Sequence, residues 1–289
     1  MKKRSILLCA LPLFLLCGCG GGSGETLTRR EIPISTVEPT VAPAQSGDTN
    51  ISQTNTGGAT QKDVLVSEVK DLNTIPSLFV KKLASFKSYK AVTKGKTTAS
   101  VLFINTDQSI EVTTIKGDYS YMKNESHSSL VNTSHEVYYH NNNAYYSDNS
   151  GEFKRSTLSE YLGIYGVYPF EQAIEGYSID ADCITKVEKK DVVDGTYTFK
   201  LTFDPEKATN NVRIQMKQFG GLDGYPKFEM IEINISIRDD FTPVKLELES
   251  RYSASKMVST SCHQQYSVTY SGFNESIEIP NLAKAKENI

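Results

Sequence analysis

Hydrophobic residues at two different spacings divide the chain into helices and strands. Ile75, Phe79, Leu83 and Phe86 recur at helical spacing, which predicts an amphipathic helix with Pro76 in its first turn. After this helix, short runs of alternating or β-branched residues are separated by polar or glycine-containing breaks. This pattern predicts a meander of antiparallel strands. The predicted strands cover residues 97–105, 108–115, 118–123, 135–140 and 143–148.

The second half of the chain continues the sheet and adds helices. Asp204, Pro205 and Glu206 predict a helix start, because aspartate caps free amides, proline suits the first helical position and glutamate favours the positive dipole end. Asp239 and Asp240 lie between two alternating runs, where they predict a hairpin turn rather than a calcium site. We expect short helices at residues 157–162 and 169–174, and strands at 184–190, 196–203, 231–237, 244–249, 266–270 and 277–279.

The first 19 residues have the pattern of a lipoprotein signal peptide. A basic start precedes an apolar run, residues 6–16, that is shorter than the roughly 17 to 25 residues needed to cross a bilayer. The run ends in Leu16-Cys17-Gly18-Cys19, which resembles the bacterial lipobox. The resemblance implies cleavage of residues 1–18 and diacylation of Cys19, and two acyl chains anchor a protein stably. The alternative is an ordinary secretory signal with incidental cysteines.

Residues 19–66 are predicted to form a tether. They are rich in Gly, Ser, Thr and Pro and contain no aromatic residue, so they cannot bury enough apolar surface to offset the entropy of ordering. The tether either lets the domain search near a membrane or is only a spacer through a cell wall. The folded domain is then residues 67–289. A formal charge of −3 does not favour nucleic-acid binding.

The order of predicted elements resembles that of the LolA/LppX-like lipoproteins, over residues 68–285. The resemblance is carried by the helix ending in Phe86-Lys87-Ser88-Tyr89, the meander, the inserted helices and the hairpin with Asp239-Asp240-Phe241-Thr242-Pro243. It implies an α+β, mostly β fold, in which a strongly curved antiparallel sheet, or half-open β-barrel, carries the N-terminal and inserted helices on its concave side. It also implies carriage of lipids or lipoproteins, or activation of a protein partner.

No pattern in the sequence is typical of an enzyme or of a metal site. The chain has no nucleophile elbow, no Walker loop and no dinucleotide-binding glycine motif after a strand. His135 and His140 are one residue too far apart for the zinc-protease motif, and on a strand their odd separation places them on opposite faces. We therefore expect a protein that is not an enzyme, with no catalytic residue, cofactor or metal.

Tyrosines crowd into residues 119–177, and a glycine-flanked segment there is a candidate lid over the mouth of the half-barrel. Tyrosine suits a cleft for an amphiphile, a glycan or a protein surface, because it has an apolar body and a polar tip. Sheet propensity with core packing is the alternative. The candidate cleft or lid residues are Tyr161, Ile164, Tyr165, Val167, Tyr168 and Phe170.

Two further cysteines, Cys183 and Cys262, lie in the predicted exported domain. A disulfide between them would close a long loop and contribute about 4 kcal/mol in the chain-entropy model. The alternative is a pair of thiols.

Together these features predict a lipoprotein on the extracytoplasmic face of a bacterial membrane, anchored through diacylglyceryl-Cys19. Its curved sheet is expected to bind a hydrophobic or amphiphilic ligand, such as a lipid, or an envelope protein partner. The alternative function is that of a cell-wall-associated adhesin or structural surface lipoprotein.

Overall fold

A computed structural model describes most of the predicted folded domain. The described residues are 64–101, 104–129, 132–149, 151–157, 160–161, 181–218, 226–255 and 259–287. The predicted signal peptide, Cys19 and nearly all of the predicted tether lie outside them, as do residues 162–180.

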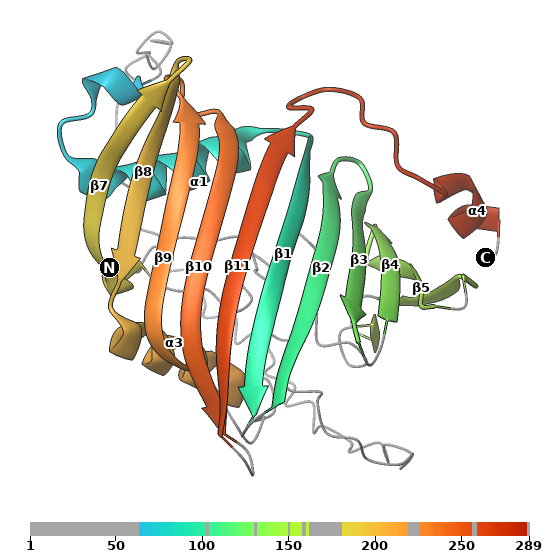
Figure 1. Ribbon diagram of the computed structural model, residues 1–289. Helices are drawn as coiled ribbons and strands as arrows, with labels where there is room; N and C mark the ends of the chain where they lie inside the picture. Colours follow the sequence, from blue (N-terminus) through green and yellow to red (C-terminus); the bar gives the residue numbers. More distant parts are fainter. Residues whose placement is uncertain are drawn as a thin grey trace, which may run out of the picture. The chain divides into compact units, whose positions relative to one another are not determined.

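The described residues form many strands and a few helices (Figure 1). The strands are β1 (Tyr89–Val101), β2 (Ile104–Lys116), β3 (Ser120–Ser128), β4 (Asn132–His140), β5 (Asn143–Ser147), β6 (Lys154–Thr157), β7 (Ile184–Val193), β8 (Thr196–Phe203), β9 (Lys227–Arg238), β10 (Pro243–Ser255) and β11 (Ser259–Ser271). The α-helices are α1 (Ile75–Ser85), α3 (Pro205–Gln218) and α4 (Leu282–Glu287), and the 3-10 helices are η1 (Val66–Glu68), η2 (Leu72–Thr74) and η3 (Ala181–Cys183).

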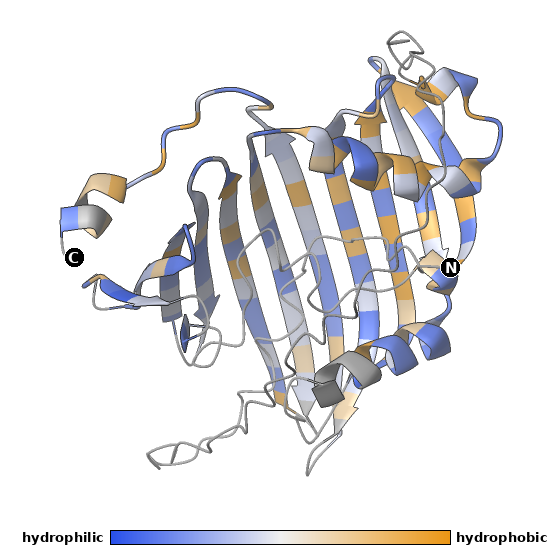
Figure 2. Cartoon of the chain, turned by 180° about the vertical axis from the view of Figure 1, so that it is seen from behind, coloured by the Kyte–Doolittle hydropathy of each residue, from blue (hydrophilic) through white to orange (hydrophobic). Residues whose placement is uncertain are grey.

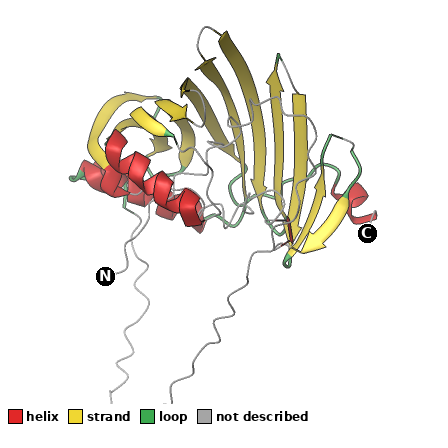
Figure 3. Cartoon of the chain, turned by 90° about the horizontal axis from the view of Figure 1, so that it is seen from below, coloured by secondary structure: helices red, strands yellow, loops and turns green. Residues whose placement is uncertain are grey.

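Within the described residues the strands form one antiparallel sheet of eleven strands that does not close. Its order is β6-β5-β4-β3-β2-β1-β11-β10-β9-β8-β7, so two meanders meet where β1 pairs with β11. That pairing runs from Lys90 opposite Ser271 to Val101 opposite Thr260. Figure 3 shows that the sheet is curved, with helices inside the curve. The predicted fold, mostly β with a curved antiparallel sheet, is confirmed.

Helices α1 and α3 lie on the same face of the sheet, which is the concave face (Figure 2). Helix α1 crosses one end of the strands, where the ring of Phe79 packs edge-on against Tyr270 of β11 at 6.2 Å. Helix α3 crosses the other end, where the backbone N–H of Phe228 in β9 donates to Thr209 Oγ1 at 2.9 Å. The sequence therefore predicted the side of the sheet on which both helices lie.

Local signals place these two helices. Of the predicted apolar face, Ile75, Phe79 and Leu83 lie in α1 and are buried. Phe86 is buried too, but it follows the end of the helix in an extended conformation. Asp204 precedes α3, and its Oδ1 accepts from the backbone N–H groups of Glu206 and Lys207 at 3.0 and 3.1 Å. Both helix starts were predicted correctly.

Strand β9 shows most clearly how one face of the sheet is buried. Ile231, Ile233, Ile235 and Ile237 are at most 2 % exposed, whereas the residues between them are partly exposed. Alternation of this kind is expected for an antiparallel strand with one face against a core. The neighbouring strands β8 and β10 place buried apolar side chains in register with these isoleucines. These side chains are Phe199, Leu201, Leu246 and Leu248.

At the β2–β5 end the sheet is buried on both faces. On the convex face Tyr121 and Tyr138 pack with Ala285 of α4. Ile277 and Ile279 pack against the same cluster but lie in a segment without strand structure. The predicted strand at 277–279 is therefore wrong: the alternating apolar residues cover the sheet without pairing with it.

The predicted strand at residues 97–105 is also wrong. Strand β1 ends at Val101 and β2 begins at Ile104, so the hairpin connection falls inside the predicted strand. Apolar residues on both sides of the connection hid the break, because no turn residue separates them.

The turn between β9 and β10 contacts the two helices η1 and α1, which precede the sheet in the chain. Asp239 Oδ1 accepts from the backbone N–H of Ser67 at 2.9 Å. Asp240 accepts from the backbone N–H of Thr242 at 2.9 Å and from its hydroxyl at 2.8 Å, and Lys82 Nζ of α1 lies 3.3 Å from Asp240 Oδ2. Both aspartates therefore act in a turn, as predicted; Asp239 also ties η1 to the sheet, and Asp240 ties α1 to it.

The charge of Asp240 is stabilised in the folded state. Desolvation raises the pKa of its carboxyl, but the two hydrogen bonds from Thr242 and the Lys82 ammonium outweigh it and lower the pKa below its usual range.

We expect Asp240→Asn to lower the free energy of unfolding at neutral pH by about 1 kcal/mol, because charge-assisted hydrogen bonds weaken. Since the folded-state pKa is depressed, the wild-type contribution is complete above the unfolded pKa of about 3.9 and is lost as pH falls through the folded value. Urea titrations between about pH 5 and pH 2 should therefore show a shallower loss of stability in the variant.

The matched control is Asp191→Asn, which changes an exposed carboxyl on the edge strand β7. An Asp240→Asn protein with the pH dependence of the wild type would contradict the role of this turn.

Candidate functional site

Five polar side chains lie on the concave face, from the middle of the strands toward α3. We call them the polar strip: Thr97 of β1, Ser250 and Tyr252 of β10, and Gln264 and Tyr266 of β11. Each is at most 4 % exposed. The strand register places Thr97 opposite Gln264 and Gln264 opposite Ser250, so the strip runs across three adjacent strands.

The members of the polar strip hydrogen-bond to one another. Gln264 Nε2 donates to the Tyr252 hydroxyl at 3.0 Å, and Gln264 Oε1 accepts from Ser250 Oγ at 3.3 Å. The hydroxyls of Thr97 and Tyr266 are 2.7 Å apart. Buried polar groups without partners are costly, so this mutual bonding explains how polar side chains persist in an apolar face.

A glycine makes room for the tyrosine of the strip. Gly95 lies opposite Tyr266 in the middle of β1. A Cβ atom placed on Gly95 would lie 1.9 Å from Cδ1 of the Tyr266 ring and 2.7 Å from the carbonyl oxygen of Gln265. Glycine in a strand interior often marks such a close approach. The ring therefore lies against the backbone of β1, which brings its hydroxyl to Thr97.

The polar strip carries no formal charge. Burial raises the pKa of Tyr266, more than the hydrogen bond with Thr97 lowers it, so its phenol stays protonated at neutral pH. The remaining groups are an amide, two aliphatic hydroxyls and a second phenol. Such a surface can donate to and accept from neutral polar groups, whereas a buried charge there would lack an opposite charge.

Apolar side chains flank Gly95 and Tyr266 on both sides of the β1–β11 seam, whereas Gln108 of β2 lies opposite Thr97 and donates to Ser126 Oγ of β3. Ile110 of β2 lies opposite Gly95, and Leu248 of β10 lies opposite Tyr266. Both are at most 4 % exposed. The concave face thus places neutral polar groups beside buried apolar side chains, which is an arrangement that suits an amphiphile.

Tyr161 is the one predicted cleft residue that the structure describes. It is fully buried on the concave side of β4 and β5, and its ring packs against Tyr139 and Tyr146 at 5.5 and 5.4 Å. The other predicted cleft or lid residues lie outside the described residues; they are Ile164, Tyr165, Val167, Tyr168 and Phe170. The prediction of a lid therefore stays a prediction.

A histidine fixes the hydroxyl of Tyr161. His135 Nδ1 is 2.7 Å from Asp148 Oδ1, and His135 Nε2 is 2.6 Å from the Tyr161 hydroxyl. Because the carboxylate can only accept, Nδ1 carries a proton. Burial raises the pKa of Tyr161, and the nearby Asp148 charge adds to this, so the phenol stays protonated and inert as a nucleophile. The three side chains hold the tyrosine cluster in place.

Other tyrosines of the crowded region lie on the opposite face. The hydroxyls of Tyr121 and Tyr138 donate to Glu136 Oε1 at 3.1 and 2.6 Å. Burial, followed by the Glu136 charge, raises the pKa of Tyr121. The described tyrosines of β3, β4 and β5 thus fill two cores, so for Tyr121, Tyr138, Tyr139 and Tyr146 the core-packing alternative is correct.

The predicted disulfide is not formed, and both cysteines are buried thiols. Cys183 lies directly before β7, whereas Cys262 is in β11, and three strands separate β7 from β11. At about 4.8 Å per strand this is roughly 19 Å along the sheet, and a disulfide needs Cα atoms within about 7 Å. Of the two alternatives, the pair of thiols is therefore correct, because the order of the strands keeps the cysteines apart.

His135 and His140 lie in β4 on opposite faces, as their spacing predicts. His140 Nδ1 is 2.9 Å from the carbonyl oxygen of Asp118, and its ring stacks on Tyr119. Across the described ranges, no group of three or more His, Cys, Asp or Glu side chains is arranged to hold a metal ion.

No helix among the described residues combines the length and the apolar character needed to span a membrane.

Comparisons with known proteins found similar structures but no similar sequences. No family model matches the chain. No curated protein matches it either.

Three solved structures are similar at low sequence identity. The ywiB protein from Bacillus subtilis is 11% identical, with a TM-score of 0.23, 64% of this chain covered and 96% of the other. A DUF1329 family protein from Desulfovibrio piger is 10% identical, with a TM-score of 0.25 and coverage of 74% and 96%. A LolA superfamily protein from Nitrosomonas europaea is 12% identical, with a TM-score of 0.22 and coverage of 68% and 89%. TM-scores this low support no inference about function.

Sequence reasoning missed the polar strip, although a signal was present. The alternation that turns Val268 and Tyr270 toward the concave face also turns Gln264 and Tyr266 toward it. The alternation through Leu246 and Leu248 does the same for Ser250. A polar residue at an inward position of a half-buried strand is the signal that could have identified the strip.

We expect Gly95→Ala to destabilise the fold by about 1–3 kcal/mol, because the new methyl group overlaps the Tyr266 ring. Its cost should be smaller in a Tyr266→Ala background, and urea denaturation of the four proteins gives the coupling free energy. Gly117→Ala is the matched control, since its Cβ would meet only the carbonyl oxygen of Tyr119, at 3.7 Å. Equal costs for Gly95→Ala in both backgrounds would contradict the packing described here.

Proposed function

We propose that the protein is a non-enzymatic lipoprotein that binds a neutral amphiphile on the concave face of its sheet. The observation that carries this proposal is the polar strip: a chain of uncharged hydrogen-bonding groups in the middle of an apolar face. This chemistry fits an amphiphile whose apolar chain packs against the apolar side chains and whose neutral polar group hydrogen-bonds to the polar strip.

The energetics favour such a ligand over a charged one. Each methylene removed from water contributes about 0.8 kcal/mol, so an acyl chain provides most of the affinity. An ester, hydroxyl or amide can replace hydrogen bonds within the strip, for example those of Gln264 with Ser250 and Tyr252. A carboxylate or phosphate there would lose its hydration without gaining an opposite charge.

We further propose that the domain acts at the extracytoplasmic face of a bacterial membrane. Support comes from the sequence alone: Leu16-Cys17-Gly18-Cys19 resembles a lipobox, and residues 19–66 have the composition of a tether. An acylated Cys19 would keep the domain near a source of amphiphiles while the tether lets it reach them.

The test is displacement of a fluorescent lipid probe from the full-length chain by monoolein and by oleate at alkaline pH. The two ligands share an acyl chain and differ in the charge of the head. We expect monoolein to compete better, and Gln264→Leu to weaken it about tenfold, or about 1.4 kcal/mol. Thr97→Val is a second, nearly isosteric variant with the same expected direction.

Gln265→Leu is the matched control. Gln265 is the next residue of β11, faces the other side of the sheet and is exposed. If the Gln264 and Gln265 variants bind monoolein equally, or if oleate competes better than monoolein, the polar strip is not the binding site. A probe that does not bind at all would favour an adhesin or a protein partner.

A further inference from the structure

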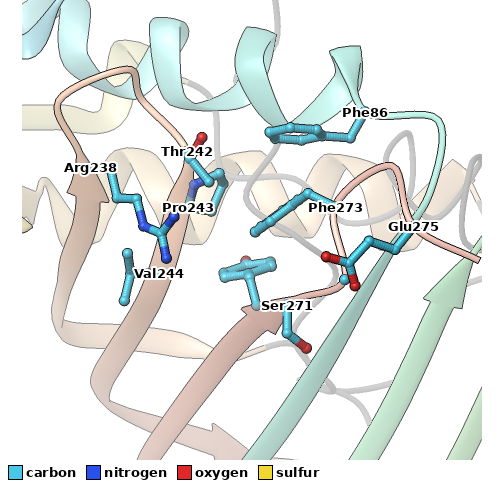
Figure 4. A pocket seen from close by; sticks show the side chains of 10 residues that line it. Phe86, Arg238, Thr242, Pro243, Val244, Ser271, Phe273 and Glu275 are labelled. Carbon is cyan, nitrogen blue, oxygen red and sulfur yellow. The ribbon is translucent and has the colours of Figure 1, made fainter. Parts of the chain in front are cut away.

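A pocket of about 410 Å³ lies at the end of the sheet, away from the polar strip (Figure 4). Three parts of the chain form it: the β9–β10 turn, the connection from α1 to β1, and the segment that follows β11. Its lining combines aromatic rings with one cationic and one anionic side chain, which distinguishes it from the uncharged polar strip.

The two charged side chains approach the pocket from different elements. Arg238 ends β9, and Glu275 follows β11; Figure 4 shows both side chains directed into the pocket. Within the described part of the chain, neither has an ion-pair partner within 4.0 Å. Neighbouring charges differ in this respect, because Asp240 pairs with Lys82 at 3.3 Å. The pocket therefore offers a guanidinium and a carboxylate that a ligand can engage.

Aromatic rings line the pocket between these charges. The rings of Phe86 and Phe273 lie 4.3 Å apart, and Tyr270 also lines the pocket. The ammonium of Lys82, which pairs with Asp240, lies 5.8 Å from the centroid of Phe86, so one of these rings already lies beside a cation. Aromatic faces next to a carboxylate are the usual surroundings of an ammonium or quaternary ammonium group.

Backbone hydrogen bonds hold both charged residues in place. The carbonyl oxygen of Glu275 accepts from Ser88 Oγ at 2.7 Å, and Asn274 Oδ1 accepts from the backbone N–H of Lys87 at 2.8 Å. On the other side, the backbone N–H of Arg238 donates to the carbonyl oxygen of Thr242 at 2.9 Å. A ligand would therefore meet a site whose backbone is already ordered, which lowers the entropy cost of binding.

We propose that this pocket binds a small zwitterion. Its anionic group, a phosphate or carboxylate, pairs with the Arg238 guanidinium, and its ammonium lies against the aromatic rings beside Glu275. A simple anion would be repelled by Glu275 and a simple cation by Arg238, so the pocket selects molecules that carry both charges. Free betaines and phosphocholine-type lipid headgroups share this chemistry.

The proposal is independent of the amphiphile site, because no residue of the polar strip lines the pocket. Variants of Gln264 should leave zwitterion binding unchanged, and variants of Arg238 should leave monoolein binding unchanged.

The test is an NMR titration of the full-length chain, in a nonionic detergent, with phosphocholine and with glycine betaine. Choline and inorganic phosphate serve as half-ligands. We expect at least one zwitterion to bind about tenfold more tightly than either half, and Arg238→Gln and Glu275→Gln each to weaken it about tenfold, because each removes a charge-assisted contact.

Arg251→Gln and Glu229→Gln are the matched controls, since both residues are exposed on the same sheet and neither lines the pocket. Repeating the titration in phosphatidylcholine and phosphatidylglycerol nanodiscs distinguishes the sources. Competition from phosphatidylcholine alone identifies a lipid headgroup, and equal binding in both identifies a soluble zwitterion. The proposal is overturned if neither zwitterion binds, if a half-ligand binds as tightly, or if the pocket variants bind like the controls.

Discussion

The pairing of β1 with β11 is the interaction on which the rest of the structure depends. It joins strands about 170 positions apart in the sequence and turns two local meanders into one sheet of eleven strands. The polar strip exists only because of it, since Thr97 and Tyr266 meet across this seam. The end pocket depends on it too, because the segment after β11 is held against the start of β1. Contacts this distant in sequence are costly in loop-closure entropy, so long strands with many paired residues are needed to stabilise them.

The second constraint is the cost of burying polar groups. The polar strip satisfies its side chains with one another and remains uncharged, whereas the pocket at the end of the sheet keeps its two charges exposed. The two surfaces therefore suit different ligands: a neutral amphiphile in the first and a zwitterion in the second. A protein that binds both a neutral amphiphile and a zwitterion would find both ligands at a membrane surface.

The sequence predicted the elements that local signals determine. The isoleucines of β9, the Asp204 cap and the apolar face of α1 each depend on residues a few positions apart. The sequence was misleading where the structure depends on contacts between distant residues. Ile277 and Ile279 alternate like a strand but only cover a neighbouring face of the sheet. The distance between Cys183 and Cys262 is set by the order of the strands. The polar strip was missed for the same reason, because its members come from three strands and become a group only once the register is known. Of the candidate cleft or lid residues, the described structure includes Tyr161 alone, which belongs to a packed core.

Native mass spectrometry of the protein purified from its own cells shows directly whether the concave face holds a neutral amphiphile. Covalent acylation of Cys19 would add a mass that survives mild activation, whereas a bound ligand would be released. We expect a releasable adduct with the mass of an uncharged lipid or related amphiphile. A protein that carries no releasable adduct, or only anionic lipid, would contradict it.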